Sequence, residues 1–248
     1  MERLFWFPWN DAGAVETALR GLLARQGWFG SGSGFERARP RGLHAGAAQR
    51  VRLEVRRDGA GVLVRLAAEP LGGTQMGGDG GLLDELAREG QKALANHLLQ
   101  LNFSWFEPGR LAAFKNPRRA SSPRLATEFL RRQRVEWLLC LDDRCRSLPG
   151  EEWAETLHAH LPDGEGPAPG QAREVVSSIE GALGRGRVAG VHCAEGTGRT
   201  GTALALLLVA RGLPEREALA EAERRRSPYF LLNSRQRAAV AAFETGKG

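Results

Sequence analysis

The sequence predicts an α/β protein in which a central, mostly parallel sheet flanked by helices spans residues 107–248, preceded by a small α+β unit over residues 1–106. Two observations support this division. Beyond residue 107, short apolar segments alternate with segments that repeat apolar residues at helical spacing, which is typical of a helix-flanked parallel sheet. Before it, two stretches that alternate apolar and polar residues flank the Asp58-Gly59 pair, which indicates an antiparallel hairpin.

The first unit is predicted to contain a strand, a helix, a hairpin and a second helix. Aromatic residues 3–9 are typical of a strand, and Asp11 can cap the helix that follows. A loop rich in glycine, arginine and proline is expected over residues 30–46, and a helix over 82–101. No motif here indicates a function, so we expect only that this unit contacts either a partner or the second unit.

The second unit begins after a cluster of proline, glycine and charged residues in FEPGRLAAFKNPRR. A helix should start at Pro123 with Ser121 or Ser122 as its cap. The all-apolar stretch VEWLLCL indicates a strand buried on both faces. The remaining predicted elements are helices over 151–158, 171–183, 199–210, 214–226 and 234–244 and a strand over 187–191.

Composition excludes several classes of protein. Apolar residues make up 42% and charged residues 26% of the 248, as in ordinary globular proteins. The net charge of +6 comes almost entirely from arginine with acids interleaved, so no nucleic-acid partner is expected. The longest uncharged apolar stretch, residues 202–210, is too short to span a membrane. The N-terminus does not resemble a signal peptide, and three cysteines do not form a disulfide framework, so a cytoplasmic location is expected.

One loop combines the features of an anion site. Residues 191–201, VHCAEGTGRTG, join an apolar strand to an apolar helix. Open α/β sheets bind ligands outside the carboxyl ends of their strands, and a helix N-terminus favours an anion. Glycines in this loop let successive N–H groups face one ligand. The predicted phosphate-binding residues are Ala194, Glu195, Gly196, Thr197, Gly198 and Arg199.

Cys193 stands at the start of this loop and is the candidate nucleophile. A helix N-terminus and a nearby arginine both favour the thiolate form of a cysteine. Arg199 offers a planar fork that matches two phosphate oxygens, and the hydroxyl of Thr200 could donate to the sulfur when it leaves. A buried core cysteine is the alternative, but the glycines and the arginine around Cys193 favour a thiolate that attacks phosphorus.

The stretch HCAEGTGRT resembles the His-Cys-x5-Arg-Ser/Thr signature of cysteine-dependent protein tyrosine phosphatases, and its Gly-Arg-Thr-Gly ending is most similar to the dual-specificity branch. The resemblance covers roughly residues 110–245. It implies that His192 orients the loop and that an aspartate about thirty residues upstream acts as general acid. Asp163 lies at that spacing in a Pro-Asp-Gly stretch. A simple turn is the alternative role for Asp163; Asp142 and Asp143 compete for the acid role but are expected to be structural.

The resemblance also implies a possible redox partner for Cys193, because some relatives protect the thiolate as a disulfide. Cys140 and Cys145 are the candidates, and a core position for either is an equal alternative. Neither a cofactor nor a metal is expected, since His158 and His160 have no third ligand at suitable spacing.

The resemblance implies hydrolysis of a phosphate monoester on a tyrosine, serine or threonine of a protein. Lipid-directed relatives carry lysines in the loop, whereas this chain has Ala194, Glu195 and Thr197 in the variable positions. The negative charge of Glu195 should repel a highly charged substrate. The alternatives are a phosphate-recognition module without turnover, and a phosphatase that acts on an inositol phosphate or an RNA 5′-triphosphate.

Overall fold

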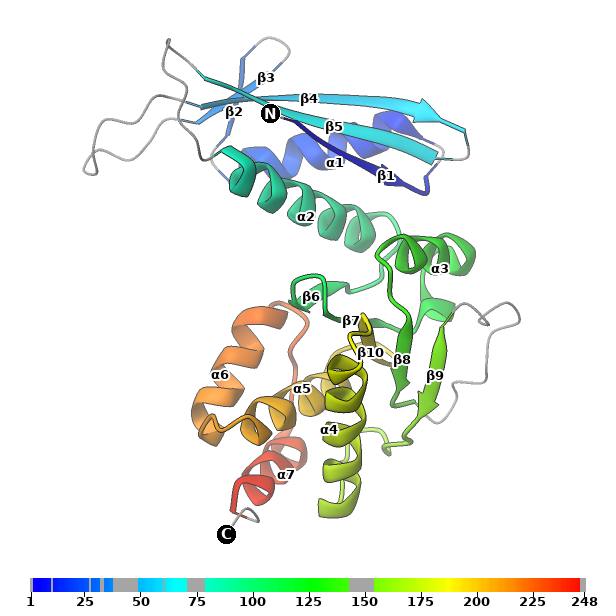
Figure 1. Cartoon of the computed structure of the whole chain (residues 1–248), viewed down its shortest axis with the longest axis vertical. Helices are drawn as coiled ribbons and strands as arrows, with labels where there is room; N and C mark the ends of the chain where they lie inside the picture. Colours follow the sequence, from blue (N-terminus) through cyan, green and yellow to red (C-terminus); the bar gives the residue numbers. More distant parts are fainter. Residues whose placement is uncertain are drawn as a thin grey trace, which may run out of the picture. The chain divides into compact units, whose positions relative to one another are not determined.

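The structure is a computed structural model that describes residues 2–9, 11–26, 28–31, 34–37, 49–59, 61–70, 79–142 and 154–245. The chain divides into two compact units, Met1–Leu98 and Leu99–Gly248 (Figure 1). This division lies a few residues before the predicted one at 106/107. The cluster of proline and glycine at 108–109 is a tight turn within the second unit, with Gly109 at φ +70°, and joins two strands of one sheet.

The first unit is a five-stranded antiparallel sheet with two helices, α1 (Ala12–Arg25) and α2 (Asp79–His97), which pack against each other and against its strands. In sheet order, the strands are β1 (Glu2–Phe7), β5 (Gly61–Pro70), β4 (Gln49–Asp58), β3 (Gly34–Arg37) and β2 (Phe29–Ser31). The predicted hairpin is present, with Asp58 opposite Gly61, and Asp11 caps α1 by accepting a hydrogen bond from the N–H of Ala14.

The predicted loop over 30–46 is wrong in part, because residues 29–31 and 34–37 form β2 and β3. Strand β3 pairs with the edge of β4, where Phe35 lies opposite Val51, and β2 pairs in turn with β3. Their glycine- and serine-rich sequence has little strand propensity of its own. Pairing with a distant strand therefore decides their conformation, and a local pattern cannot show it.

The second unit contains the predicted mostly parallel sheet. Its strands, in spatial order, are β6 (Ser104–Glu107), β7 (Leu111–Lys115), β10 (Ala189–Cys193), β8 (Trp137–Cys140) and β9 (Glu155–His158). The last four are parallel, and β6 is antiparallel to β7. The helical elements are η1 (Pro117–Arg119), α3 (Pro123–Arg132), α4 (Pro169–Gly184), α5 (Gly198–Ala210), α6 (Glu215–Arg226) and α7 (Ser234–Thr245).

The predicted helix over 151–158 is wrong, because its last residues form β9. This strand extends the sheet at the free edge of β8, with Trp137 opposite Glu155 and Cys140 opposite His158. The backbone groups of Glu155–His158 are satisfied by that edge rather than by a helical turn. No helix within the described part of the chain is long and apolar enough to cross a membrane.

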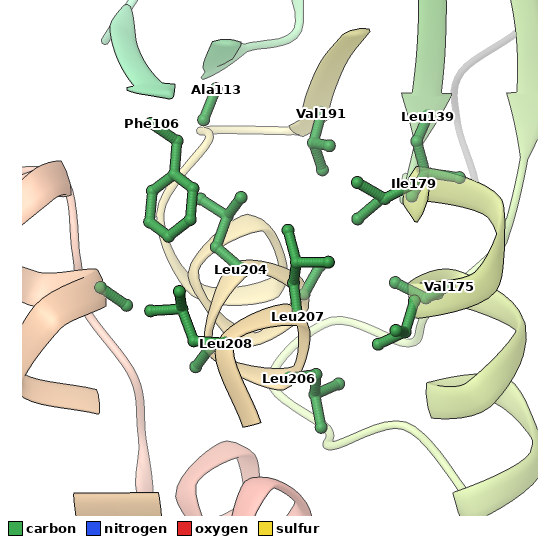
Figure 2. Close-up of a cluster of buried hydrophobic side chains, with 14 of the residues drawn as sticks. Phe106, Ala113, Leu139, Val175, Ile179, Val191, Leu204, Leu206, Leu207 and Leu208 are labelled. Carbon is green, nitrogen blue, oxygen red and sulfur yellow. The ribbon is translucent and has the colours of Figure 1, made fainter. Parts of the chain in front are cut away.

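Helix α5 is buried on nearly every side, as its composition predicts, and carries the core of the second unit (Figure 2). Leu204 and Leu207 point toward the sheet, where Val191 of β10 belongs to the same core, and α4 contributes Val175 and Ile179. The other sheet face is covered by aromatic side chains: the ring of Phe103 packs against both Phe114 and Phe129. Both faces of β10 are therefore covered, and the start of α5 is buried with them.

Candidate active site

Other segments of the chain hold the loop over residues 193–199 by donating hydrogen bonds to its carbonyl groups. The four carbonyls of residues 193–196 all accept hydrogen bonds from other segments. The donors are the N–H of Asn116 to the first two (2.9 and 3.2 Å), Asn102 Nδ2 to the third (2.9 Å) and the guanidinium of Arg226 to the fourth. Since each N–H in a trans peptide points away from the preceding carbonyl, the N–H groups of residues 194–197 face the inside of the loop. This is the arrangement of an anion-binding nest.

Gly196 makes this course of the backbone possible. Its φ of +70° lies in the left-handed region, and a Cβ there would lie 2.4 Å from the carbonyl oxygen of Phe114. A larger residue would therefore push the loop away from β7. Gly198 is likewise close to Gln236 Nε2, which would lie 2.9 Å from an added Cβ. The loop is consequently packed against the end of β7 on one side and against α7 on the other.

Cys193 and His192 are neighbours at the end of β10 and point to opposite faces of the sheet. Cys193 is buried on the face that α4 and α5 cover. His192 is buried on the aromatic face, where its ring stacks on Phe114 with centroids 5.5 Å apart. The stacking fixes the strand end from which the loop departs.

Arg199, in the first turn of α5, is buried with its guanidinium among three oxygen-bearing groups. Nη1 donates to the carbonyl of Leu161 at 3.1 Å and lies 3.7 Å from Asp142 Oδ1. Nη2 lies 3.2 Å from Asp163 Oδ1. Within the described residues, buried Nε has no hydrogen-bond partner, and neither has the buried hydroxyl of Thr200. A tetrahedral anion with several acceptor oxygens would satisfy such donors.

The two candidate carboxylates differ in exposure. The side chain of Asp163 is 88% exposed, on the loop that follows β9, yet it reaches the buried Arg199. Asp142, directly after β8, is buried and lies against the same guanidinium. The sequence alone favours a structural role for Asp142, but this residue belongs to the surroundings of Arg199; its position after a buried strand is the signal for this. Asp143 lies outside the described residues.

Comparison with known proteins decides the family. The family model described as "Swiss Army Knife protein, DSP-PTPase phosphatase domain" matches residues 100–248. The chain belongs to this family. Among solved structures, it is similar to Tk-PTP, with 29% identity and a TM-score of 0.50, over 58% of this chain and 97% of that one.

Two human proteins share the fold with this DSP-PTPase domain. DUSP28 has 17% identity and a TM-score of 0.50, over 59% of this chain and 95% of that one. The tyrosine phosphatase-like serine/threonine/tyrosine-interacting protein has 16% identity and a TM-score of 0.50, over 58% and 97%. The resemblance stated from the loop sequence is thereby confirmed at the level of family and fold.

Glu195 of the DSP-PTPase domain is not a free negative charge. Its carboxylate lies 3.2 Å from Lys115 Nζ and 2.6 Å from Arg119 Nη1. Both cations come from the end of β7 and the segment after it, which no local motif connects with the loop. The repulsion expected between Glu195 and a highly charged substrate is therefore offset by two nearby positive charges.

Arg226, at the end of α6, is the functional-site residue that sequence reasoning missed most completely. It is fully buried, and its guanidinium donates to Asn102 O (2.8 Å), Ser104 Oγ (2.7 Å), Ala113 O (3.0 Å) and Gly196 O. Burial lowers the pKa of Arg226 to about 10, although attraction to Cys193 and to Tyr229 acts in the opposite direction. The guanidinium therefore stays charged at neutral pH and fixes the loop to β6 and β7.

The possible redox partners lie less favourably. Cys140 is buried and pairs in register with His192, so it points to the sheet face opposite that of Cys193. A disulfide between them would require the strands to move, because the Cβ vectors diverge; the pairing stays a prediction. Cys145 lies outside the described residues. Among the residues that the structure describes, no three His, Cys, Asp or Glu side chains form a group that could hold a metal.

Proposed function

We propose that the chain is a metal-independent phosphatase that hydrolyses phosphate monoesters on protein side chains through a phosphocysteine intermediate. The observation that carries this proposal is the loop over residues 193–199: its first four carbonyls are bound from outside, so the N–H groups that follow them face inward, and the buried Nε of Arg199 has no partner among the described residues. Such a set of preorganised donors stabilises the charge that develops on transferred phosphoryl oxygens.

The first step is attack of Cys193 Sγ on phosphorus. An S–P bond forms, the P–O bond to the leaving group breaks, and Asp163 gives its proton to the departing oxygen. In the second step, Asp163 takes a proton from water, whose oxygen attacks phosphorus and releases inorganic phosphate. The sulfur leaves as thiolate and accepts a hydrogen bond from the Thr200 hydroxyl, which is buried and has no other partner among the described residues.

The preference for a protein substrate rests on the loop, which contains no lysine in its variable positions. A second candidate is an inositol phosphate, because Lys115 and Arg119 lie beside the loop, each paired with the side chain of Glu195. If Glu195 turns away, these two cations could bind a second phosphate. An RNA 5′-triphosphate, and phosphate recognition without turnover, are further outcomes that the experiment below separates.

The test is hydrolysis of para-nitrophenyl phosphate in the presence of a metal chelator. We expect turnover by the full chain and loss of turnover in Cys193→Ser. The matched variant Cys140→Ser should retain turnover, because the side chain of Cys140 faces the other side of the sheet. Binding without turnover would indicate a recognition module. A panel of phosphopeptides, inositol phosphates and 5′-triphosphorylated RNA then assigns the substrate class. Activity that survives Cys193→Ser or requires metal would overturn the mechanism.

A further inference from the structure

The loop that carries Asp163 is fastened to the start of α7. Asn233 Nδ2 donates to the carbonyl of Gly164 at 2.8 Å, and Arg235 forms an ion pair with Glu165. At Gly166 the two segments touch so closely that an added Cβ would lie 2.5 Å from the Cβ of Ala239. Three successive residues of the loop, 164–166, thus each contact α7 or the residue that caps it.

The same turn of α7 also contacts the phosphate-binding loop. Gln236, to which the sequence alone assigns no role, is buried and lies against Gly198 at the start of α5. It forms a reciprocal cap with Asn233: the N–H of Asn233 donates to Gln236 Oε1, and the N–H of Gln236 donates to Asn233 Oδ1 at 2.9 Å. One rigid helix start therefore lies between the phosphate-binding loop and the Asp163 loop.

We propose that the start of α7, consisting of the capping residue Asn233 together with Arg235 and Gln236 and here named the α7 clamp, fixes Asp163 at Arg199 and so sets the efficiency of acid catalysis. Asn233 and Arg235 are positioning residues, because they act through the loop and not on the phosphate. The inference rests on the proposed function of Asp163 as general acid.

The exposure of Asp163 explains why such a clamp is needed. A side chain that is 88% exposed has little packing of its own to hold it, and the glycines and prolines around it form no helix or strand. Without external contacts, the loop would sample many conformations, and the carboxyl group would be placed for proton transfer only part of the time. The contacts to α7 remove that loss in advance of substrate binding.

Two substitutions separate positioning from stability. Asn233→Asp keeps an oxygen to cap α7 but replaces the donor to Gly164 with a carboxylate that repels the carbonyl. Arg235→Glu replaces the ion pair with repulsion between two carboxylates, and the exchange of Glu165→Arg with Arg235→Glu restores an ion pair. Arg237→Ala, on an exposed position of the same helix, is the matched control.

The experiment compares kcat/KM for an activated aryl phosphate, para-nitrophenyl phosphate, with that for an unactivated one, phenyl phosphate. In Asn233→Asp we expect the activated-to-unactivated ratio to rise about two- to tenfold, the equivalent of one ordinary hydrogen bond. In Arg235→Glu we expect a rise of about two- to fivefold that the charge exchange reverses. Arg237→Ala should leave the ratio as in the wild type.

Hydrogen–deuterium exchange of residues 161–168 provides a readout that does not depend on activity. The proposal predicts faster exchange of this loop in Asn233→Asp and Arg235→Glu, with exchange in the middle of α5 unchanged. Unchanged exchange and an unchanged substrate ratio in both variants would overturn the clamp while the phosphatase function stands. If the wild-type chain is inactive but the variants show faster exchange of the loop, the clamp contacts are real and the proposed phosphatase function is wrong.

Discussion

Replacing Arg226 with methionine is expected to destabilise the second unit by about 3–5 kcal/mol, because several buried acceptors would lose their donor. The structure sets this magnitude, because the fully buried guanidinium donates to four acceptors from three distant segments. Each acceptor left without a partner costs ~1–3 kcal/mol. Relaxation of the loop around Gly196 makes the total smaller than the sum of the four.

The neighbouring Arg225 provides the matched control. Its side chain is 29% exposed, pairs with Glu221 and lies over the ring of Phe106. Arg225→Met should therefore cost only about 1 kcal/mol. Arg226→Lys, which keeps the charge but offers fewer donors in a different geometry, should fall between the two methionine variants.

The assay is the free energy of opening from hydrogen exchange of the buried amides of α5, which reports the second unit separately from the first. If Arg226→Met fails to fold, Arg226→Lys supplies the comparison. If the free energy of opening of Arg226→Met or Arg226→Lys equals that of Arg225→Met, the buried hydrogen bonds of Arg226 contribute nothing measurable and the expected destabilisation is wrong.

Three further expectations follow from the site and from one surface carboxylate. Glu195→Ala should release Lys115 and Arg119 and raise activity on an inositol bisphosphate relative to para-nitrophenyl phosphate by about three- to tenfold; an unchanged ratio of kcat/KM would exclude a second phosphate subsite there. Gly196→Ala should lower para-nitrophenyl phosphate turnover at least about a hundredfold, since an added Cβ would lie 2.4 Å from the Phe114 carbonyl; near-normal kinetics would contradict this. Hydrogen bonds from Arg224 and Arg225 lower the pKa of Glu221 from 4.5 to about 2. The contribution of Glu221 to the free energy of unfolding is therefore fully present above pH 4.5 and is lost as the pH falls through about 2. Because Glu221 is only partly buried and its partner Arg224 is 70% exposed, solvent screens the ion pair, and acid titration of the wild type against Glu221→Gln should show a difference below about 1 kcal/mol.

The parts of the site that are contiguous in the chain could be predicted from the sequence. The strand, the loop with Cys193 and the start of α5 follow one another, so their residue types alone indicate an anion site, and the family resemblance implies an aspartate at the spacing of Asp163. Even so, the local pattern could not show that the loop's carbonyls are bound by Asn102, Asn116 and Arg226, which come from three other segments.

Arg226 illustrates the limit most clearly. It ends a run of three arginines on a strongly polar helix, and its neighbours Arg224 and Arg225 form the local ion pairs with Glu221 that such a sequence suggests. Its own partners stand 30 to 124 residues away. Strands β9, β2 and β3 could not be predicted for the same reason: each forms by pairing with another strand, and its own composition does not indicate a strand.

In the proposed mechanism, the phosphoryl group is transferred to the sulfur of Cys193 before water releases it. The most direct test is rapid acid quenching of the full chain during turnover of para-nitrophenyl phosphate, followed by mass spectrometry of its peptides. Asp163→Ala, which should slow hydrolysis of the intermediate, is used to increase its amount. We expect a phosphoryl group on Cys193 in the wild type and in Asp163→Ala, and none at this position in Cys193→Ser. The mechanism is contradicted if the wild type turns over substrate but neither it nor Asp163→Ala yields a phosphorylated Cys193 peptide, or if the phosphoryl group is found on another residue.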